Sequence, residues 1–143
     1  MKEVIFYNQH SQFNFSNDLI YAKGLLCVLN KELKLKEISI NVVLLSDDGL
    51  LQINKEYLNH DYYTDIITFP LEQNNEVLEA ELYISIDRIE DNAKTNSVDF
   101  LVEFKRVLVH GVLHLCGYND KTNEEIKTMR QKEDYYLSSE CFT

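Results

Sequence analysis

Two histidines four positions apart are the side chains whose types and spacing most clearly suggest chemistry. His110 and His114 lie within residues 100–120, FLVEFKRVLVHGVLHLCGYND. On a helix, positions i and i+4 project from adjacent turns of one face, and helical zinc-binding pairs use this spacing. Gly117 allows the chain to leave the helix through a left-handed turn. That turn can bring Asp120 back toward both rings.

Two imidazole nitrogens and one carboxylate oxygen would give a metal ion three protein ligands. The fourth tetrahedral position would stay open, as catalytic zinc requires, and such an ion lowers the pKa of bound water to about 7 and polarises a phosphoryl or carbonyl oxygen. The sequence therefore predicts one zinc ion, or another divalent metal, held by His110, His114 and Asp120. One alternative is that the pair is two hydrogen-bonded histidines at the edge of a cleft.

The residues next to the histidine pair limit the classes of reaction that the site could catalyse. Zinc peptidases of the HExxH type place a glutamate after the first histidine as general base, and this chain has Gly111 there. Arg106, one turn before His110, is a weak catalytic candidate that could neutralise charge on a phosphate. An ion pair of Arg106 with Glu103 or with a carboxylate of the sheet is the favoured interpretation. Glu103 lies about 10 Å along the helix from His110, so no general base is assigned.

The pattern of apolar residues predicts the elements that position this segment. Period-two or β-branched runs predict strands at 4–7, 37–45, 64–69 and 78–86, with Pro70 ending the third. Helical periodicity and capping residues predict helices at about 18–33, 46–58, 87–95, 100–116 and 122–136. We expect one α+β domain over residues 1–143, in which a small mixed β-sheet packs with about five helices and the metal site lies in a cleft.

Composition and charge limit the possible partners. The chain of 143 residues has a net charge of −10, which excludes a uniformly basic nucleic-acid coat. The acid is concentrated in residues 61–99, with ten acidic and two basic side chains, whereas residues 100–132 hold six basic and four acidic ones. A local, salt-sensitive RNA contact near the histidines therefore remains compatible with the charge.

The sequence also bears on cellular location. No apolar run approaches the roughly 18 residues of a membrane span, and the N-terminus lacks a signal-peptide pattern. The three cysteines, Cys27, Cys116 and Cys141, are an odd number without a framework spacing. We expect reduced thiols and a cytoplasmic protein.

Several segments resemble the YbeY family of bacterial endoribonucleases. Residues 110–120, HGVLHLCGYND, are similar to the family signature HGxLHLxGYDH at nine of eleven places, with Asn119 and Asp120 departing. Residues 51–70 are similar to the family segment ending TDVLSFP, and residues 79–85, EAELYIS, resemble the GDIxIS strand. The third metal ligand of the family is usually His, where this chain has Asp120. Leu58 stands where relatives commonly have Arg.

This resemblance implies an activity and partners. The family are zinc-dependent, single-strand-type endoribonucleases that hydrolyse phosphodiester bonds in late rRNA maturation, at the 3′ end of 16S rRNA, and in ribosome quality control. The implied partners are rRNA or ribosomal particles, with a ribosomal protein or a GTPase, and neither membrane nor DNA. Two alternatives remain: a metal-dependent hydrolase of a peptide or small ester, and a non-catalytic ribosome-assembly factor with a structural metal. The replacement of the family's arginine by Leu58 keeps the second alternative open.

Overall fold

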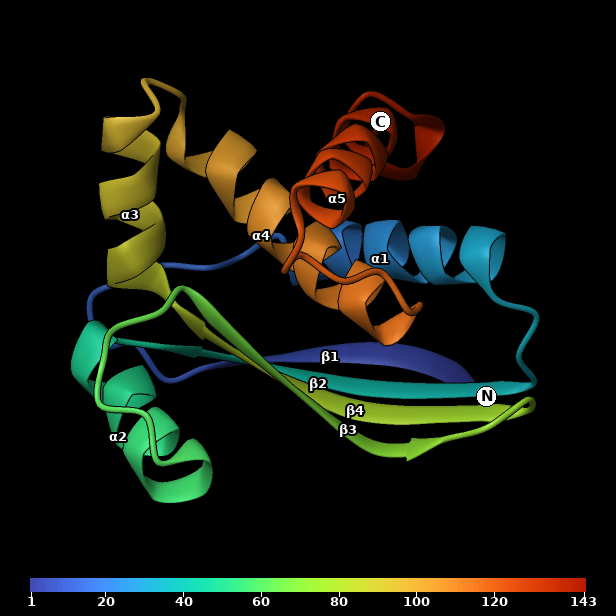
Figure 1. The fold of residues 1–143 in the computed structure, drawn as a ribbon, viewed down its shortest axis with the longest axis horizontal. Helices are drawn as coiled ribbons and strands as arrows, with labels where there is room; N and C mark the ends of the chain where they lie inside the picture. Colours follow the sequence, from blue (N-terminus) through green and yellow to red (C-terminus); the bar gives the residue numbers. More distant parts are fainter.

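Four strands form one sheet, and helices α1, α3, α4 and α5 lie to one side of it (Figure 1). The computed structural model describes all residues, 1–143. The elements in chain order are β1 Lys2–Asn8, α1 Asp18–Glu32, β2 Glu37–Leu45, α2 Asp47–Leu58, β3 Ile66–Gln73, β4 Val77–Ser85, α3 Ile86–Thr95, α4 Phe100–Leu115, α5 Asn123–Leu137 and the short 3₁₀ helix η1 Glu140–Phe142. No helix combines the length and the apolar character needed to cross a membrane.

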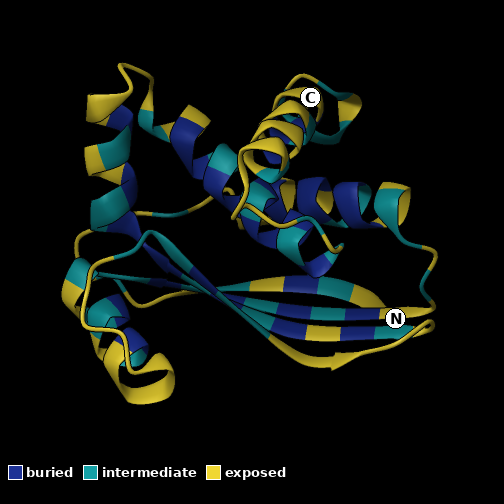
Figure 2. Ribbon diagram, in the orientation of Figure 1, coloured by how far each residue is buried: buried dark blue, intermediate teal, exposed yellow.

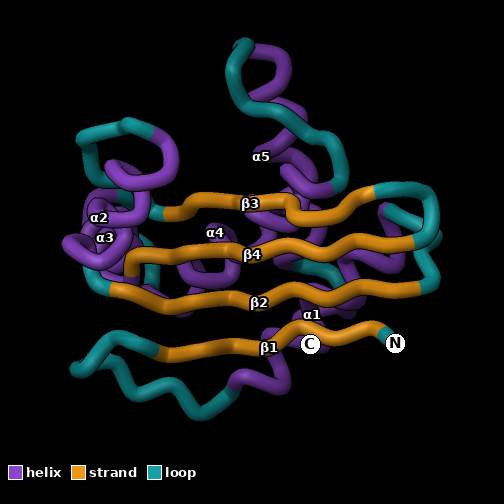
Figure 3. Tube along the Cα trace, turned by 90° about the horizontal axis from the view of Figure 1, so that it is seen from below, coloured by secondary structure: helices purple, strands orange, loops and turns teal.

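The sheet is mixed, with strand order β1-β2-β4-β3 (Figure 3). Strands β1 and β4 both run parallel to β2, while β3 pairs antiparallel with β4. Parallel strands require a crossover connection: α1 connects β1 to β2, and α2 followed by β3 connects β2 to β4. The expected α+β fold, with a small mixed sheet and five α-helices, is confirmed.

The core lies between the sheet and helices α1 and α4. Alternate residues of the two central strands are buried, which gives Figure 2 its alternating pattern; they are Ile38, Ile40, Val42, Leu44, Leu78, Ala80, Leu82 and Ile84. Helix α4 contributes Phe104, Leu108, Val109, Val112 and Leu113, which are all fully buried. The helix that carries the histidine pair is therefore held by apolar packing along most of its surface.

Strand β3 continues through Pro70, so the prediction that the strand ends there is wrong. The strand runs from Ile66 to Gln73, with an irregularity of register between Pro70 and Glu72. Because β3 pairs only with β4, it is an edge strand. Proline is tolerated on an edge strand or at a bulge, where its missing N–H costs no ladder hydrogen bond.

The cysteines also differ from expectation, because Cys27 and Cys141 form a disulfide. Cys27 lies on α1 and Cys141 in η1, and their Cα atoms are 5.4 Å apart across a sequence separation of 114 residues. The packing of η1 against α1 brings them together, and no local spacing signals such a pair. Cys116 is free, and burial raises the pKa of its thiol to about 12.

Gly111 allows α4 to approach the edge of the sheet closely. A Cβ atom built at this position would lie 2.5 Å from Cδ1 of Ile66 on β3 and 3.4 Å from Cδ1 of Leu82 on β4. The glycine that replaces the glutamate of the HExxH motif thus has a packing role. It brings the turn of His110 and His114 close to β3.

The contact between Gly111 and Ile66 can be measured with a double-mutant cycle. We expect the Cβ of Gly111→Ala to overpack the site by about 1–3 kcal/mol, against a gain of about 1 kcal/mol in helix propensity. Valine lacks the Cδ1 atom, so Ile66→Val should cost about 0.5–1.5 kcal/mol alone but clearly less in the Gly111→Ala chain. Urea denaturation of the four chains measures this coupling, and strictly additive free energies of unfolding would contradict the predicted contact.

Candidate metal centre

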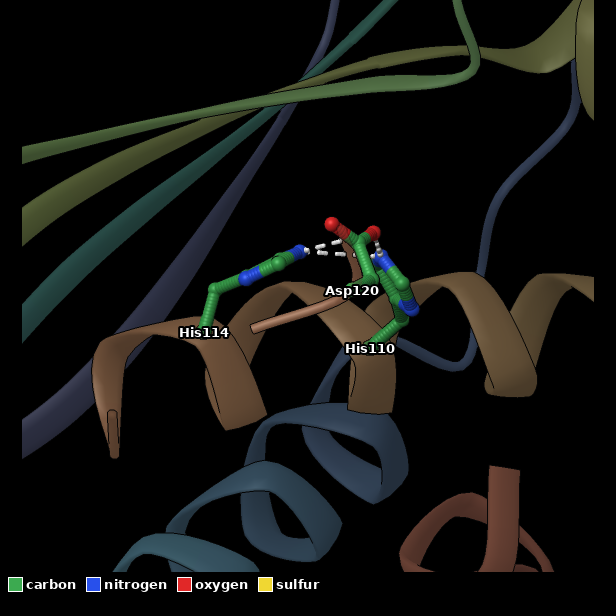
Figure 4. A group of neighbouring side chains, drawn as sticks. All are labelled: His110, His114 and Asp120. Atoms are coloured by element: carbon green, nitrogen blue, oxygen red, sulfur yellow. Dashed lines mark hydrogen bonds and ion pairs between the residues drawn. The ribbon is translucent and has the colours of Figure 1, made fainter. Parts of the chain in front are cut away.

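The three predicted metal ligands lie together, facing one another (Figure 4). His110 Nε2 is 3.0 Å from His114 Nε2, and Asp120 Oδ2 is 3.1 and 3.3 Å from these two nitrogens. Ligands at about 2.0–2.1 Å from a tetrahedral zinc ion are roughly 3.4 Å from each other. The spacing of the donor atoms therefore fits one small divalent cation.

The end of helix α4 explains how Asp120 reaches the histidines. Gly117 has φ +99°, the left-handed conformation expected there. Its N–H donates to the carbonyl of His114, and the N–H of Tyr118 donates to the carbonyl of Leu113. These two bonds form a Schellman motif, in which a glycine reverses the chain direction after a helix. The reversal returns Asp120 to the face from which the two imidazoles project.

The other nitrogen of each imidazole is already occupied. His110 Nδ1 lies 2.7 Å from Glu133 Oε2 on α5, and His114 Nδ1 lies 2.8 Å from the carbonyl oxygen of Tyr118. A carbonyl or a carboxylate only accepts hydrogen bonds, so each neutral ring carries its hydrogen on Nδ1. Both Nε2 atoms then present lone pairs toward Asp120, and a metal-ligating histidine has this tautomer and this kind of support.

Three electron-pair donors at these distances require a positive charge among them. Although burial disfavours the charged ring, the hydrogen bond to Glu133 and the charges of Glu133 and Asp120 raise the pKa of His110. Burial likewise opposes ionisation of Glu133, but its bonds to His110 and Arg106 lower the pKa of this carboxyl. Either a proton on His110 or a metal ion can supply the positive charge.

Arg106 pairs with α5 instead of with Glu103. Its Nη1 lies 2.9 Å from Glu133 Oε1 and its Nη2 lies 2.8 Å from Asp134 Oδ1. The predicted ion pair of Arg106 is confirmed, but its predicted partners, Glu103 or a carboxylate of the sheet, are wrong. Glu103 is buried, and burial raises the pKa of its carboxyl. A direct role for Arg106 on substrate phosphate stays a prediction. In this structure its guanidinium binds two carboxylates.

The triad lies between two open clefts. One, of about 470 Å³, runs beside β3 and the loop before it, and the three ligands share its wall with Leu58, His60, Tyr62, Thr64, Asp65, Thr68 and Gln73. The other, of about 330 Å³, faces α5 and contains Glu103, Arg106, Asp120, Arg130 and Glu133. The ligand side chains are 25%, 27% and 40% exposed for His110, His114 and Asp120. The space around the donor atoms is therefore accessible to a substrate.

Sequence analysis missed Glu133, the partner of His110. Glu133 is only 4% exposed, and the other buried side chains of α5 are Met129 and Tyr136. An acidic residue on the apolar stripe of an amphipathic helix was the available signal, because a buried charge requires a partner. The partner itself is 23 positions away in sequence.

We expect Glu133→Ala to weaken metal binding by about 10–100-fold, because it removes the carboxylate that orients His110. Asp134→Ala is the matched control, since Asp134 is the second partner of Arg106 and makes no bond to His110. Chelator competition measures both dissociation constants. An equal loss of affinity in the two variants would contradict a specific role for Glu133.

Comparisons with known proteins identify the family of the chain. Residues 5–140 match the family described as Endoribonuclease YbeY. Proteins named Endoribonuclease YbeY from Flavobacterium johnsoniae and Cytophaga hutchinsonii are 43% and 41% identical to the chain. The first alignment covers 92% of this chain and 93% of the relative, and the second covers 99% and 100%.

A solved structure has the same fold. The solution structure of a protein from Thermotoga maritima superposes with a TM-score of 0.64 and 26% identity, over 96% of this chain and 87% of that one. Sequence and fold therefore agree along nearly the whole length. On this evidence, the chain belongs to the Endoribonuclease YbeY family.

Proposed function

We propose that this protein is a metal-dependent endoribonuclease that hydrolyses phosphodiester bonds of rRNA. One zinc ion, held by His110, His114 and Asp120, is the proposed cofactor. The observation that carries the proposal is the convergence of three lone-pair donors at 3.0–3.3 Å, with both Nδ1 hydrogens bonded elsewhere. Relatives that are 43% and 41% identical to the chain are named endoribonucleases, which supports RNA as the substrate.

The openness of the site favours catalysis over a structural role for the metal. A structural zinc is closed by four protein ligands, whereas catalytic zinc keeps one position for water or substrate. Here three protein donors meet at a place that opens onto both clefts. This arrangement favours an enzyme over a non-catalytic assembly factor. A hydrolase of another substrate class would have the same centre, so the substrate is the part to be tested.

The side chains around the centre have separable tasks. A divalent ion bound there would lower the pKa of its water and polarise a phosphoryl oxygen. Glu133 and the carbonyl of Tyr118 fix the two imidazole rings, so that both Nε2 lone pairs point to one place. The cleft beside β3 offers Thr64 and Thr68 as hydrogen-bonding groups along a path for single-stranded RNA.

Charge at the site makes RNA binding dependent on the metal. The cleft facing α5 is lined by four carboxylates, those of Asp65, Glu103, Asp120 and Glu133, against the guanidinium groups of Arg106 and Arg130. The local basic surplus expected for residues 100–132 is thus offset by Asp65 and Glu133. Arg130 is 59% exposed and lies 3.8 Å from Glu133, so it is the more available cation for a phosphate. A bound divalent ion would balance the remaining negative charge.

Membership of the family supports a proposal for the biological setting. We propose that the substrate is rRNA within ribosomal particles in the cytoplasm, near the 3′ end of 16S rRNA. A ribosomal protein or a GTPase would deliver it. An acidic protein with few free cations at its site has little electrostatic affinity for RNA by itself. A partner that brings the RNA would supply the missing affinity.

Metal content tests the ligand set directly. We expect His114→Ala to lose stoichiometric metal, because two ligands do not make a tight site. Asp120→His should retain metal, since imidazole is also a zinc ligand, whereas Asp120→Ala should not. Elemental analysis of the purified proteins measures this. Stoichiometric metal in both His114→Ala and Asp120→Ala would refute the site.

Cleavage of structured rRNA tests the activity. Metal-loaded protein should cut in single-stranded regions, and His110→Ala prepared in parallel should show no cleavage above background. Equal cleavage by the two preparations would point to a contaminating nuclease and contradict the assignment. A protein that binds one metal ion but leaves RNA intact would favour the hydrolase or assembly-factor alternatives.

A further inference from the structure

Glu32, the last residue of α1, accepts hydrogen bonds from three donors in distant parts of the chain. Its carboxylate accepts from the hydroxyl of Tyr118 at 2.7 Å, from Lys132 Nζ at 3.2 Å and from the hydroxyl of Tyr136. The side chain of Glu32 is 12% exposed. Charge-assisted hydrogen bonds of this kind are stronger than bonds between neutral groups. Glu32 therefore ties α1 to the loop after α4 and to α5.

One of these hydrogen bonds connects Glu32, through Tyr118, to the proposed metal ligand His114. Tyr118 is held to Glu32 by its hydroxyl, and its backbone carbonyl accepts the hydrogen of His114 Nδ1 at 2.8 Å. Lys132 also lies 5.6 Å from the centre of the Tyr118 ring, so the ring is held on a second side. Tyr118 comes after the left-handed Gly117, where a Cβ would contact nothing within 4 Å. The side chain of Tyr118 thus anchors the turn to α1 and α5.

The other two hydrogen bonds of Glu32 connect it to α5, the helix whose Glu133 binds His110. Lys132 and Tyr136 both belong to α5, the helix that carries Glu133. Because Glu133 binds His110 Nδ1, the same carboxylate of Glu32 restrains the elements behind both imidazoles. The side chain of Glu32 makes no contact with the triad itself and lines neither of the two clefts beside it.

We propose that Glu32 is a positioning residue of the metal centre, acting on His114 through Tyr118. The inference rests on the metal centre proposed above and extends it to a residue outside both clefts. Without the tie, the carbonyl of Tyr118 can move away from His114, and the ring loses the acceptor that sets its tautomer and orientation. The metal site would then be less pre-organised, although all three ligands remain present.

The test measures Co²⁺ binding by the full-length protein, using chelator competition and the visible absorption of the bound ion. We expect Tyr118→Phe, which removes only the hydroxyl, and Glu32→Ala to weaken Co²⁺ binding by about three- to tenfold and to alter the visible band, a smaller effect than loss of a direct partner of a ligand. Glu32→Gln should fall between wild type and Glu32→Ala, because its amide oxygen can still accept from Tyr118. In the Glu32→Ala chain, adding Tyr118→Phe should have little further effect.

Two controls separate positioning from general destabilisation. Tyr83→Phe removes a hydroxyl that donates to Glu81 at 3.0 Å, a similar bond within strand β4, and should leave Co²⁺ affinity unchanged. Leu44→Ala, in the core, lowers stability without touching the turn. Urea denaturation of each metal-free protein provides the stability scale.

The outcomes are distinguishable. If Tyr118→Phe and Glu32→Ala lose stability but bind Co²⁺ as tightly as wild type, Glu32 has only a structural role and the inference is overturned. If Leu44→Ala loses as much affinity as they do, the effect is general and the inference also fails. If wild type binds no Co²⁺, the metal centre itself is wrong and the inference falls with it. Failure to cleave RNA, by contrast, would count against the endoribonuclease proposal alone.

Discussion

Three lone-pair donors about 3 Å apart repel one another unless a positive charge lies among them. The structure creates this situation by giving each imidazole an acceptor for its Nδ1 hydrogen, so that both Nε2 atoms turn toward Asp120. Three parts of the fold hold this arrangement in place. Apolar packing fixes α4, Gly117 reverses the chain, and α5 supplies Glu133. A metal ion at the centre would convert this unfavourable contact into ligation.

Local signals in the sequence were enough to predict which groups would meet. The i, i+4 spacing of His110 and His114 depends only on helix geometry, and the return of Asp120 depends on the positive φ of Gly117. The mixed sheet and five helices also followed from local periodicity and capping, including the capping box of Thr122 and Glu125. The role of the three residues as metal ligands remains a prediction.

Long-range contacts could not be predicted in this way. Glu133 and Glu32 act through partners 23 and 86 residues away, and the disulfide joins positions separated by 114 residues. Strand β3 continues through Pro70 because it lies at the sheet edge, and strand order was not derivable from the sequence. In each case the missing information was which elements pack side by side.

The placement of the charged residues explains how a chain with a net charge of −10 can act on RNA. On β4, Glu79 and Glu81 alternate with the buried residues Leu78 and Ala80, so they point away from α4 and the metal centre. At the centre itself, carboxylates outnumber guanidinium groups, so a bound divalent ion would be the main positive charge available to a phosphate. Metal binding and substrate binding are therefore expected to be linked.

The link between metal binding and cleavage can be measured in one titration. Protein stripped of metal by a chelator is titrated with Zn²⁺ while cleavage of structured rRNA is followed on the same sample. We expect no cleavage by the metal-free protein, and a rate that rises with added Zn²⁺ and levels off at one equivalent per chain. Full cleavage without metal would contradict this expectation.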